Sequence, residues 1–217
     1  KDLEGRQVAV AKGTVLHWAL LKALQDNGLA LRDIQLVDLK TADQLAALSA
    51  GSVDAAVGSS SLLTLRDKGV GKVFYSSKAQ GAKASGFGGI LVSEAFEKQY
   101  PDATQRIANG LVKAAHWLGQ EANRDEAYRL WTLSGMPYQA FKDDYDGVSL
   151  KEAFNPRVDA FLLSQYEDAI DFTRENKLIR QDIDVARWAA PQYVENALRA
   201  QGLQSFWPTR AALVARP

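Results

Sequence analysis

Cysteine is absent from the 217 residues of this sequence, and histidine occurs only twice. Without cysteine the chain has no disulfide, no thiolate zinc site and no cysteine nucleophile of its own. Lysine and arginine (26) balance aspartate and glutamate (26), so no net field attracts nucleic acid or a membrane surface. We therefore expect no nucleic-acid partner, no metal and no cofactor.

Long hydrophobic runs are missing as well. No stretch approaches the roughly 18 consecutive apolar residues of a membrane span, and no signal peptide opens the sequence. If the protein is exported, we expect that a leader was removed before Lys1. The apolar share of 47% and the charged share of 24% are typical of a globular protein with a substantial core, in one domain or two small ones.

A short apolar stretch near the N-terminus organises the rest of the chain. Residues 7–11 (QVAVA) predict a strand buried in a parallel sheet. Gly13 then permits a tight turn, Thr14 is a favourable N-cap, and apolar residues recur at helical spacing from Val15 until Gly28 ends the run. The free amides of a helix N-terminus would thus lie at the carboxyl end of a strand, where open α/β sheets bind anions. An ordinary βα turn with a capping threonine remains the simpler alternative, because no nucleotide-binding glycine motif is present.

Strands and helices alternate as far as Ser93, and beyond it only helical patterns follow. The further predicted strands are Ile34–Leu39, Val53–Val57, Val73–Tyr75 and Gly89–Ser93. This alternation predicts an α/β fold with a doubly wound parallel sheet. We predict an α/β lobe at residues 1–88, a mostly helical segment at 89–203 and a C-terminal extension at 204–217.

A second turn of the same chemistry follows the third predicted strand. It reads Gly58-Ser59-Ser60-Ser61, and in a parallel sheet it would share the carboxyl edge with Gly13-Thr14. Hydroxyls and helix-terminal amides at one edge favour a compact oxyanion, which accepts many hydrogen bonds. The predicted ligand-binding residues are Gly13, Thr14, Ser59, Ser60 and Ser61, with His17 and Lys78 as weaker candidates to flank the anion. Serines at helix starts are also common caps, so each turn alone has a purely structural alternative.

Catalytic and metal-binding patterns are not found. Neither His17 nor His116 has a second histidine at ligand spacing, and the serine turn is not the GxSxG of a hydrolase. The run Asp143–Asp146 lacks the calcium-loop pattern and is typical of a solvated turn. We predict a binding function without catalysis.

Taken in order, several segments resemble the periplasmic solute-binding proteins of ABC importers for sulfonates, taurine and nitrate. The matching residues are Asp2–Val10, Lys12–Thr14, His17, Leu21, Leu24, Gly28–Leu29, Ala42–Leu48, Gly51–Ala55, Leu91–Ser93, Phe96 and Pro101. The resemblance implies two α/β lobes that close on a small anionic ligand, a location in the periplasm or otherwise outside the cytoplasm with a membrane anchor, a membrane permease as partner and a monomer. It also implies that this chain begins at the second lobe, that part of the first lobe precedes Lys1, and that the helical segment completes that first lobe.

One departure and two rival functions accompany this resemblance. The family often has a Trp-Asp-Pro-like turn where this chain has Gly58-Ser59-Ser60, which weakens any specific sulfonate assignment. An aromatic sulfinate desulfinase shares the scaffold, and its C-terminal helices resemble the segment that starts at Trp188. Such an enzyme needs a cysteine nucleophile, which a preceding region would have to supply. A third possibility is the sensory domain of a cytosolic regulator.

Overall fold

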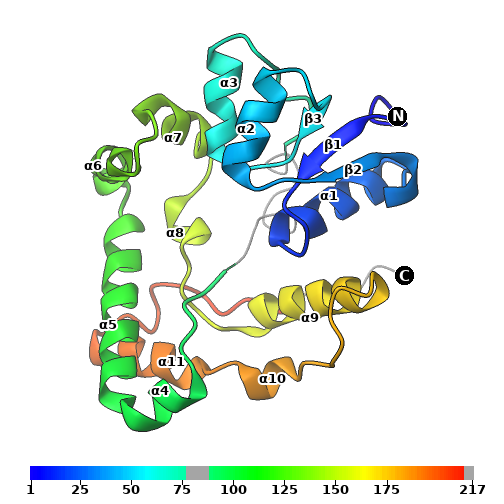
Figure 1. Ribbon diagram of the computed structural model, residues 1–217. Coiled ribbons are helices and arrows are strands. Elements are labelled where there is room, and N and C mark those ends of the chain that lie inside the picture. The colour runs from blue at the N-terminus through cyan, green and yellow to red at the C-terminus, as the bar shows by residue number, and fades with distance from the viewer. Residues whose placement is uncertain (77–87, 213–217) are drawn as a thin grey trace. The chain divides into compact units, whose positions relative to one another are not determined.

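The computed structural model describes residues 1–76 and 88–212, and Figure 1 shows its helices and strands. Within these residues the chain divides into two compact units. The first takes in the described residues of Lys1–Gly86, Gly135–Asp144 and Phe172–Arg180, and the second those of Phe87–Ser134, Tyr145–Asp171 and Gln181–Pro217. The domain boundaries expected from the sequence stay a prediction.

The first unit is built on a parallel sheet of three strands in the order β2-β1-β3. The central strand β1 (Gln7–Val10) pairs with β2 (Gln35–Asp38) along its whole length, and its Val8 lies opposite Ala55 of β3 (Ala55–Ala56). Val8, Ala9 and Val10 are fully buried, because β1 is the central strand and helices cover both faces of the sheet (Figure 1). Three of the five predicted strands are therefore confirmed, and so is the α/β fold class.

Helices flank both faces of this sheet. The remaining elements of the unit are α1 (Val15–Asp26), η1 (Leu31–Asp33), α2 (Thr41–Ser49), η2 (Ser60–Leu62), α3 (Leu63–Asp67) and α7 (Tyr138–Asp144). The chain passes from the central strand to one edge through α1 and then to the other edge through α2. Right-handed crossovers in opposite directions place these helices on opposite faces, as Figure 1 shows for α1 and α2.

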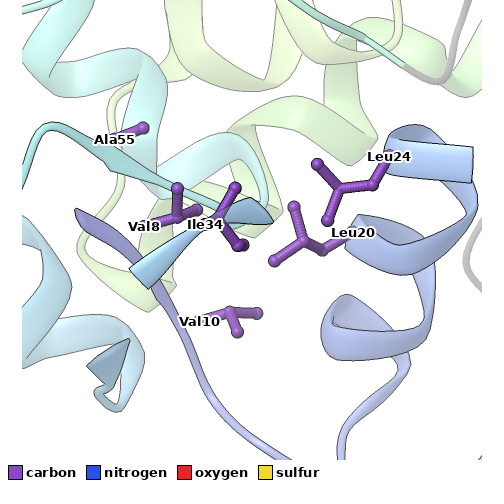
Figure 2. Packing of buried hydrophobic residues seen from close by; sticks show 6 residues of the cluster. All are labelled: Val8, Val10, Leu20, Leu24, Ile34 and Ala55. Atoms are coloured by element: carbon purple, nitrogen blue, oxygen red, sulfur yellow. The ribbon is translucent and has the colours of Figure 1, made fainter. Parts of the chain in front are cut away.

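One hydrophobic cluster holds α1 against the sheet (Figure 2). Leu20 and Leu24 lie four residues apart on one face of α1 and pack with Val8, Val10 and other apolar side chains of the strands. Burying each leucine contributes about 1.5–3 kcal/mol to folding. The cluster therefore fixes the start of α1 beside the carboxyl end of β1.

Two of the predicted strands are wrong. Val73–Tyr75 and Gly89–Ser93 have no strand assignment, and their side chains are open to solvent, with Phe74 59% and Leu91 71% exposed. Their β-branched and aromatic residues favour extended backbone locally. A strand also requires a hydrogen-bonded neighbour, and the described residues supply none to either stretch.

Helices are the only regular elements in the described residues of the second unit, and the sequence predicted only helical patterns beyond Ser93. Its elements are α4 (Glu94–Gln99), α5 (Pro101–Leu118), η4 (Glu121–Asn123), α6 (Arg124–Trp131), η5 (Thr132–Ser134), α8 (Leu150–Ala153), α10 (Val185–Trp188) and α11 (Pro191–Ala200). Helix α9 (Ala160–Glu175) begins in this unit, and its residues from Phe172 onward belong to the first.

The core of the second unit lies between α5 and α11. Ala108, Val112 and Ala115 of α5 meet Ala197 and Leu198 of α11. Small alanines on both helices allow their axes to approach closely. Ile107 and Leu111 of α5 are exposed, because α11 packs on the neighbouring face of the helix, which carries Ala108 and Val112.

The segment after α11 docks onto this core. The indole of Trp207 is fully buried and its Nε1 donates to the carbonyl of Lys151 at 2.8 Å. The buried guanidinium of Arg157 donates to the carbonyls of Trp207 (2.9 Å) and Gln204 and to the Glu195 carboxylate (2.7 Å). The start of the predicted C-terminal extension is therefore an ordered part of the second unit.

Candidate functional site

The first predicted anion-binding turn joins β1 to α1. Gly13 has φ +73°, which a residue with a side chain adopts only with strain, and Thr14 is the extended N-cap of α1. The Thr14 hydroxyl makes no capping bond to the helix; it donates instead to the carbonyl of Ala11 at 2.7 Å. The amides of Thr14, Val15 and Leu16 have no acceptor among the described residues. The first turn of α1 thus offers three backbone donors.

His17 lies against this turn from inside the first unit. Its side chain is only 3% exposed, and its ring stands edge-on to Phe172 at a centroid distance of 5.4 Å. Nδ1 accepts the N–H of Gly13 at 3.3 Å, so the neutral ring carries its proton on Nε2. Nε2 has no partner among the described residues. Burial, and secondarily the positive charge of Lys12, lowers the pKa of His17 from 6.5, while Asp38 acts in the opposite direction.

The second turn follows β3. Ser59 is exposed and serves as the N-cap of η2, and Ser60 and Ser61 are half-buried. The Oγ atom of Ser61 is buried without a partner among the described residues. A Cβ atom on Gly58 would come within 2.9 Å of Leu62 Cδ1, so a larger residue here would require the Leu62 side chain to shift.

The second turn differs from the prediction in one respect. The sequence indicated that a helix dipole begins here, as it does at α1. Instead the serines open the single 3₁₀ turn η2, and the helix behind it, α3, has five residues. So short a helix has a weak dipole. This turn therefore offers hydroxyls and local amides, but not the partial positive charge of a long helix N-terminus.

Strand order brings the two turns to one edge. Because β1 is hydrogen-bonded to β3 in parallel, Gly13-Thr14 and Gly58–Ser61 both leave the carboxyl ends of neighbouring strands. The predicted candidate Lys78 lies outside the described residues. The edge also carries a negative group, since Asp38 at the end of β2 accepts the N–H of Lys12 at 3.0 Å. This edge of the sheet thus combines the hydrogen-bond donors of the two turns with the negative charge of Asp38.

Sequence reasoning missed Gln44 on α2. This side chain is completely buried, and its Nε2 donates to the carbonyl of Leu39 at 2.7 Å. Its Oε1 has no partner among the described residues. A Cβ atom added to Gly58 would lie 3.8 Å from this oxygen. In the sequence, the unusual feature that could have identified Gln44 is a glutamine at an apolar position of an amphipathic helix. Gln44 therefore fixes the β2–α2 connection and places an unpartnered carbonyl oxygen next to Gly58.

The described residues hold no metal site, since no three His, Asp or Glu side chains there come together in a way that could hold a metal ion. None of the helices in residues 1–76 and 88–212 combines the length and apolar character needed to cross a membrane.

Comparisons with known proteins identify a family and a fold for this chain. The family model of the NMT1-like family matches residues 1–132. The solved structure of the periplasmic sulfonate-binding protein SsuA from Methylobacillus flagellatus KT superposes with a TM-score of 0.85 at 29% identity, over 99% of this chain and 66% of that one. This likeness confirms the predicted fold class.

Curated relatives include both a binding protein and an enzyme. An inferred aliphatic sulfonates-binding protein of Bacillus subtilis (strain 168) is 26% identical over 200 residues, covering 91% of this chain and 58% of that protein. A 2'-hydroxybiphenyl-2-sulfinate desulfinase of Rhodococcus erythropolis is 25% identical over 224 residues, covering 89% and 59%. This chain spans less than two thirds of the length of either relative.

Proposed function

This chain belongs to the NMT1-like family, and on that premise we propose that it forms part of a solute-binding protein that captures a small oxyanion of the sulfonate class for an ABC importer. The names of the sulfonate-binding relatives support this class of ligand. In this proposal the protein works outside the cytoplasm as a monomer, delivers its ligand to a membrane permease and catalyses no reaction.

The observation that carries the proposal is the pair of turns at one edge of the sheet. Each follows a parallel strand, and the strands are neighbours. The α1 turn supplies unpartnered amides, and the η2 turn supplies three serine hydroxyls. A sulfonate head accepts several hydrogen bonds at once, and neutral donors hold it without a permanent ion pair, which keeps release possible.

In this arrangement the residues have distinct roles. The backbone of Gly13 and Thr14 presents the amides of α1, and Ser59, Ser60 and Ser61 donate hydroxyls from the other turn. The Thr14 hydroxyl holds the turn in shape through Ala11 rather than contacting the ligand. His17 lies behind the first turn, and Lys78 stays a prediction from the sequence alone.

Calorimetry on the full-length protein with methanesulfonate, taurine, sulfate, nitrate and acetate tests the proposal. Net hydrogen bonds of about 1 kcal/mol each make the Ser59→Ala/Ser60→Ala variant bind roughly 10- to 100-fold more weakly. Adding Thr14→Ala weakens binding further by loosening the turn. The matched control is Ser49→Ala, because the Ser49 hydroxyl donates within α2, to the carbonyl of Leu45. No heat with any anion, or an unchanged affinity in the serine variant, contradicts the proposal.

An enzyme is the second candidate, and the desulfinase relative is the observation that favours it. The two relatives have similar identity to this chain, so identity alone does not separate them. This chain contains no cysteine, so a desulfinase nucleophile would lie outside it. Incubation with 2'-hydroxybiphenyl-2-sulfinate and assay of released sulfite distinguishes the two: turnover supports the enzyme, and binding without turnover supports transport.

A further inference from the structure

We propose that His17 is a positioning residue that competes with the ligand for the Gly13 amide, and that its protonation opens the first turn to the anion. This inference rests on the proposed function, since it assigns a control to the same site. Its starting point is the hydrogen bond from Gly13 N–H to His17 Nδ1.

In its neutral form His17 occupies a donor that an oxyanion needs. The imidazole lies four residues beyond Gly13, one turn into α1, and points its lone pair back at the glycine amide. The bond is long at 3.3 Å, so a negatively charged acceptor can replace it. An anion that binds the Thr14, Val15 and Leu16 amides therefore finds the adjacent Gly13 amide already hydrogen-bonded to His17.

Protonation reverses the role of the ring. Protonated Nδ1 is a donor and can no longer accept the Gly13 N–H, so that amide becomes free. The new positive charge lies directly behind the turn, where it also attracts the anion. Both changes favour the ligand, and neither requires His17 to touch it.

The surroundings of the ring determine the pH range in which this occurs. Among the described residues, the charged groups that act on His17 are Lys12 in the turn itself and Asp38 at the end of β2. Helix α9 contributes the uncharged ring of Phe172. Burial is the dominant influence and favours the neutral ring, so the pKa of His17 lies below 6.5. At neutral pH the Gly13 amide is occupied, and it is released as the pH falls through the pKa of His17, which lies below 6.5.

Linkage gives a second consequence. An anion that prefers protonated His17 must raise the pKa of His17 when it binds. Binding at a pH close to the pKa of His17 therefore takes up protons.

The first test needs no ligand. In the ligand-free protein, nuclear magnetic resonance should show a neutral His17 ring protonated on Nε2. The amide proton of Gly13 should titrate with the same midpoint as the ring, below pH 6.5. A Gly13 amide that does not follow the His17 titration overturns the proposal, whether or not any anion binds. Because this measurement uses no ligand, it can refute the role of His17 without bearing on the proposed function.

The second test uses methanesulfonate, which stays ionised throughout the range. We expect its affinity for the full-length protein to rise as the pH falls through the pKa of His17, by about tenfold once the ring is protonated, the effect of one charge-assisted hydrogen bond. Calorimetry in buffers of different ionisation enthalpy should show proton uptake. His17→Asn places an acceptor near the Nδ1 position that does not titrate, so its affinity should be independent of pH.

The matched control is His116→Asn, because His116 is the other histidine of the chain and packs against Phe206 in the second unit. This variant should keep the wild-type pH profile. An identical pH profile in wild type and His17→Asn contradicts the proposal. Loss of the profile in His116→Asn contradicts it as well.

Discussion

The carboxylate of Asp159 accepts two hydrogen bonds from the guanidinium of Arg210, at 2.9 and 3.1 Å. It also accepts the backbone N–H of Arg210 at 3.0 Å and that of Leu162 at 3.1 Å. The Asp159 side chain is 2% exposed, whereas that of Arg210 is 25% exposed. This pair anchors the C-terminal segment to the beginning of α9.

Removal of the Asp159 carboxylate should strongly destabilise the folded protein. We expect Asp159→Ala to lower the free energy of unfolding by about 3 kcal/mol, because four donors that converge on a buried carboxylate lose their acceptor. Urea denaturation followed by circular dichroism measures this change. The control is Glu94→Ala, which removes an exposed pair with Lys98 and should change stability by less than about 0.5 kcal/mol. Equal effects of the two substitutions would show that the Asp159 pair is not structural.

The same pair predicts an acid-sensitive stability. Burial alone would raise the pKa of Asp159, but the hydrogen bonds from Arg210 and Leu162 outweigh it and hold that pKa below 3.8. A depressed carboxyl pKa stabilises the folded state above pH 3.8, and this contribution is lost as the pH falls through the folded pKa. Thermal unfolding between pH 2 and 5 should show a shallower loss of stability in Asp159→Asn than in wild type. Parallel curves would contradict the assignment.

Trp207 gives a separate test of the docked segment. Its indole is fully buried against Ala197 and Leu198 and donates to the carbonyl of Lys151. Trp207→Ala should cost about 3–5 kcal/mol, and Trp207→Phe, which keeps most of the volume but loses the hydrogen bond, roughly 1–3 kcal/mol. Chemical denaturation of both variants measures the difference. If Trp207→Ala leaves stability unchanged, the segment does not dock as described.

Local patterns in the sequence were enough to predict the elements at the site. The apolar run of β1, the positive-φ Gly13 and the apolar spacing of α1 each depend on residues within a few positions of one another. The family resemblance, the α/β class and the shared edge of the two turns followed from that order. The site assignment itself stays a prediction.

Contacts between distant residues decided the rest. Residues 73–75 and 89–93 have β-forming side chains, but a strand exists only where another strand pairs with it. Likewise, α5 has apolar residues on more than one face, and α11 selected the face that is buried. The contact between His17 and Phe172, and the place where Trp207 docks, join residues far apart in the chain. The sequence by itself determined where strands, turns and helices can begin, because backbone propensity and side-chain spacing are local. Only the tertiary structure decided which surfaces and polar groups have partners, because pairing and burial depend on residues that folding alone brings together.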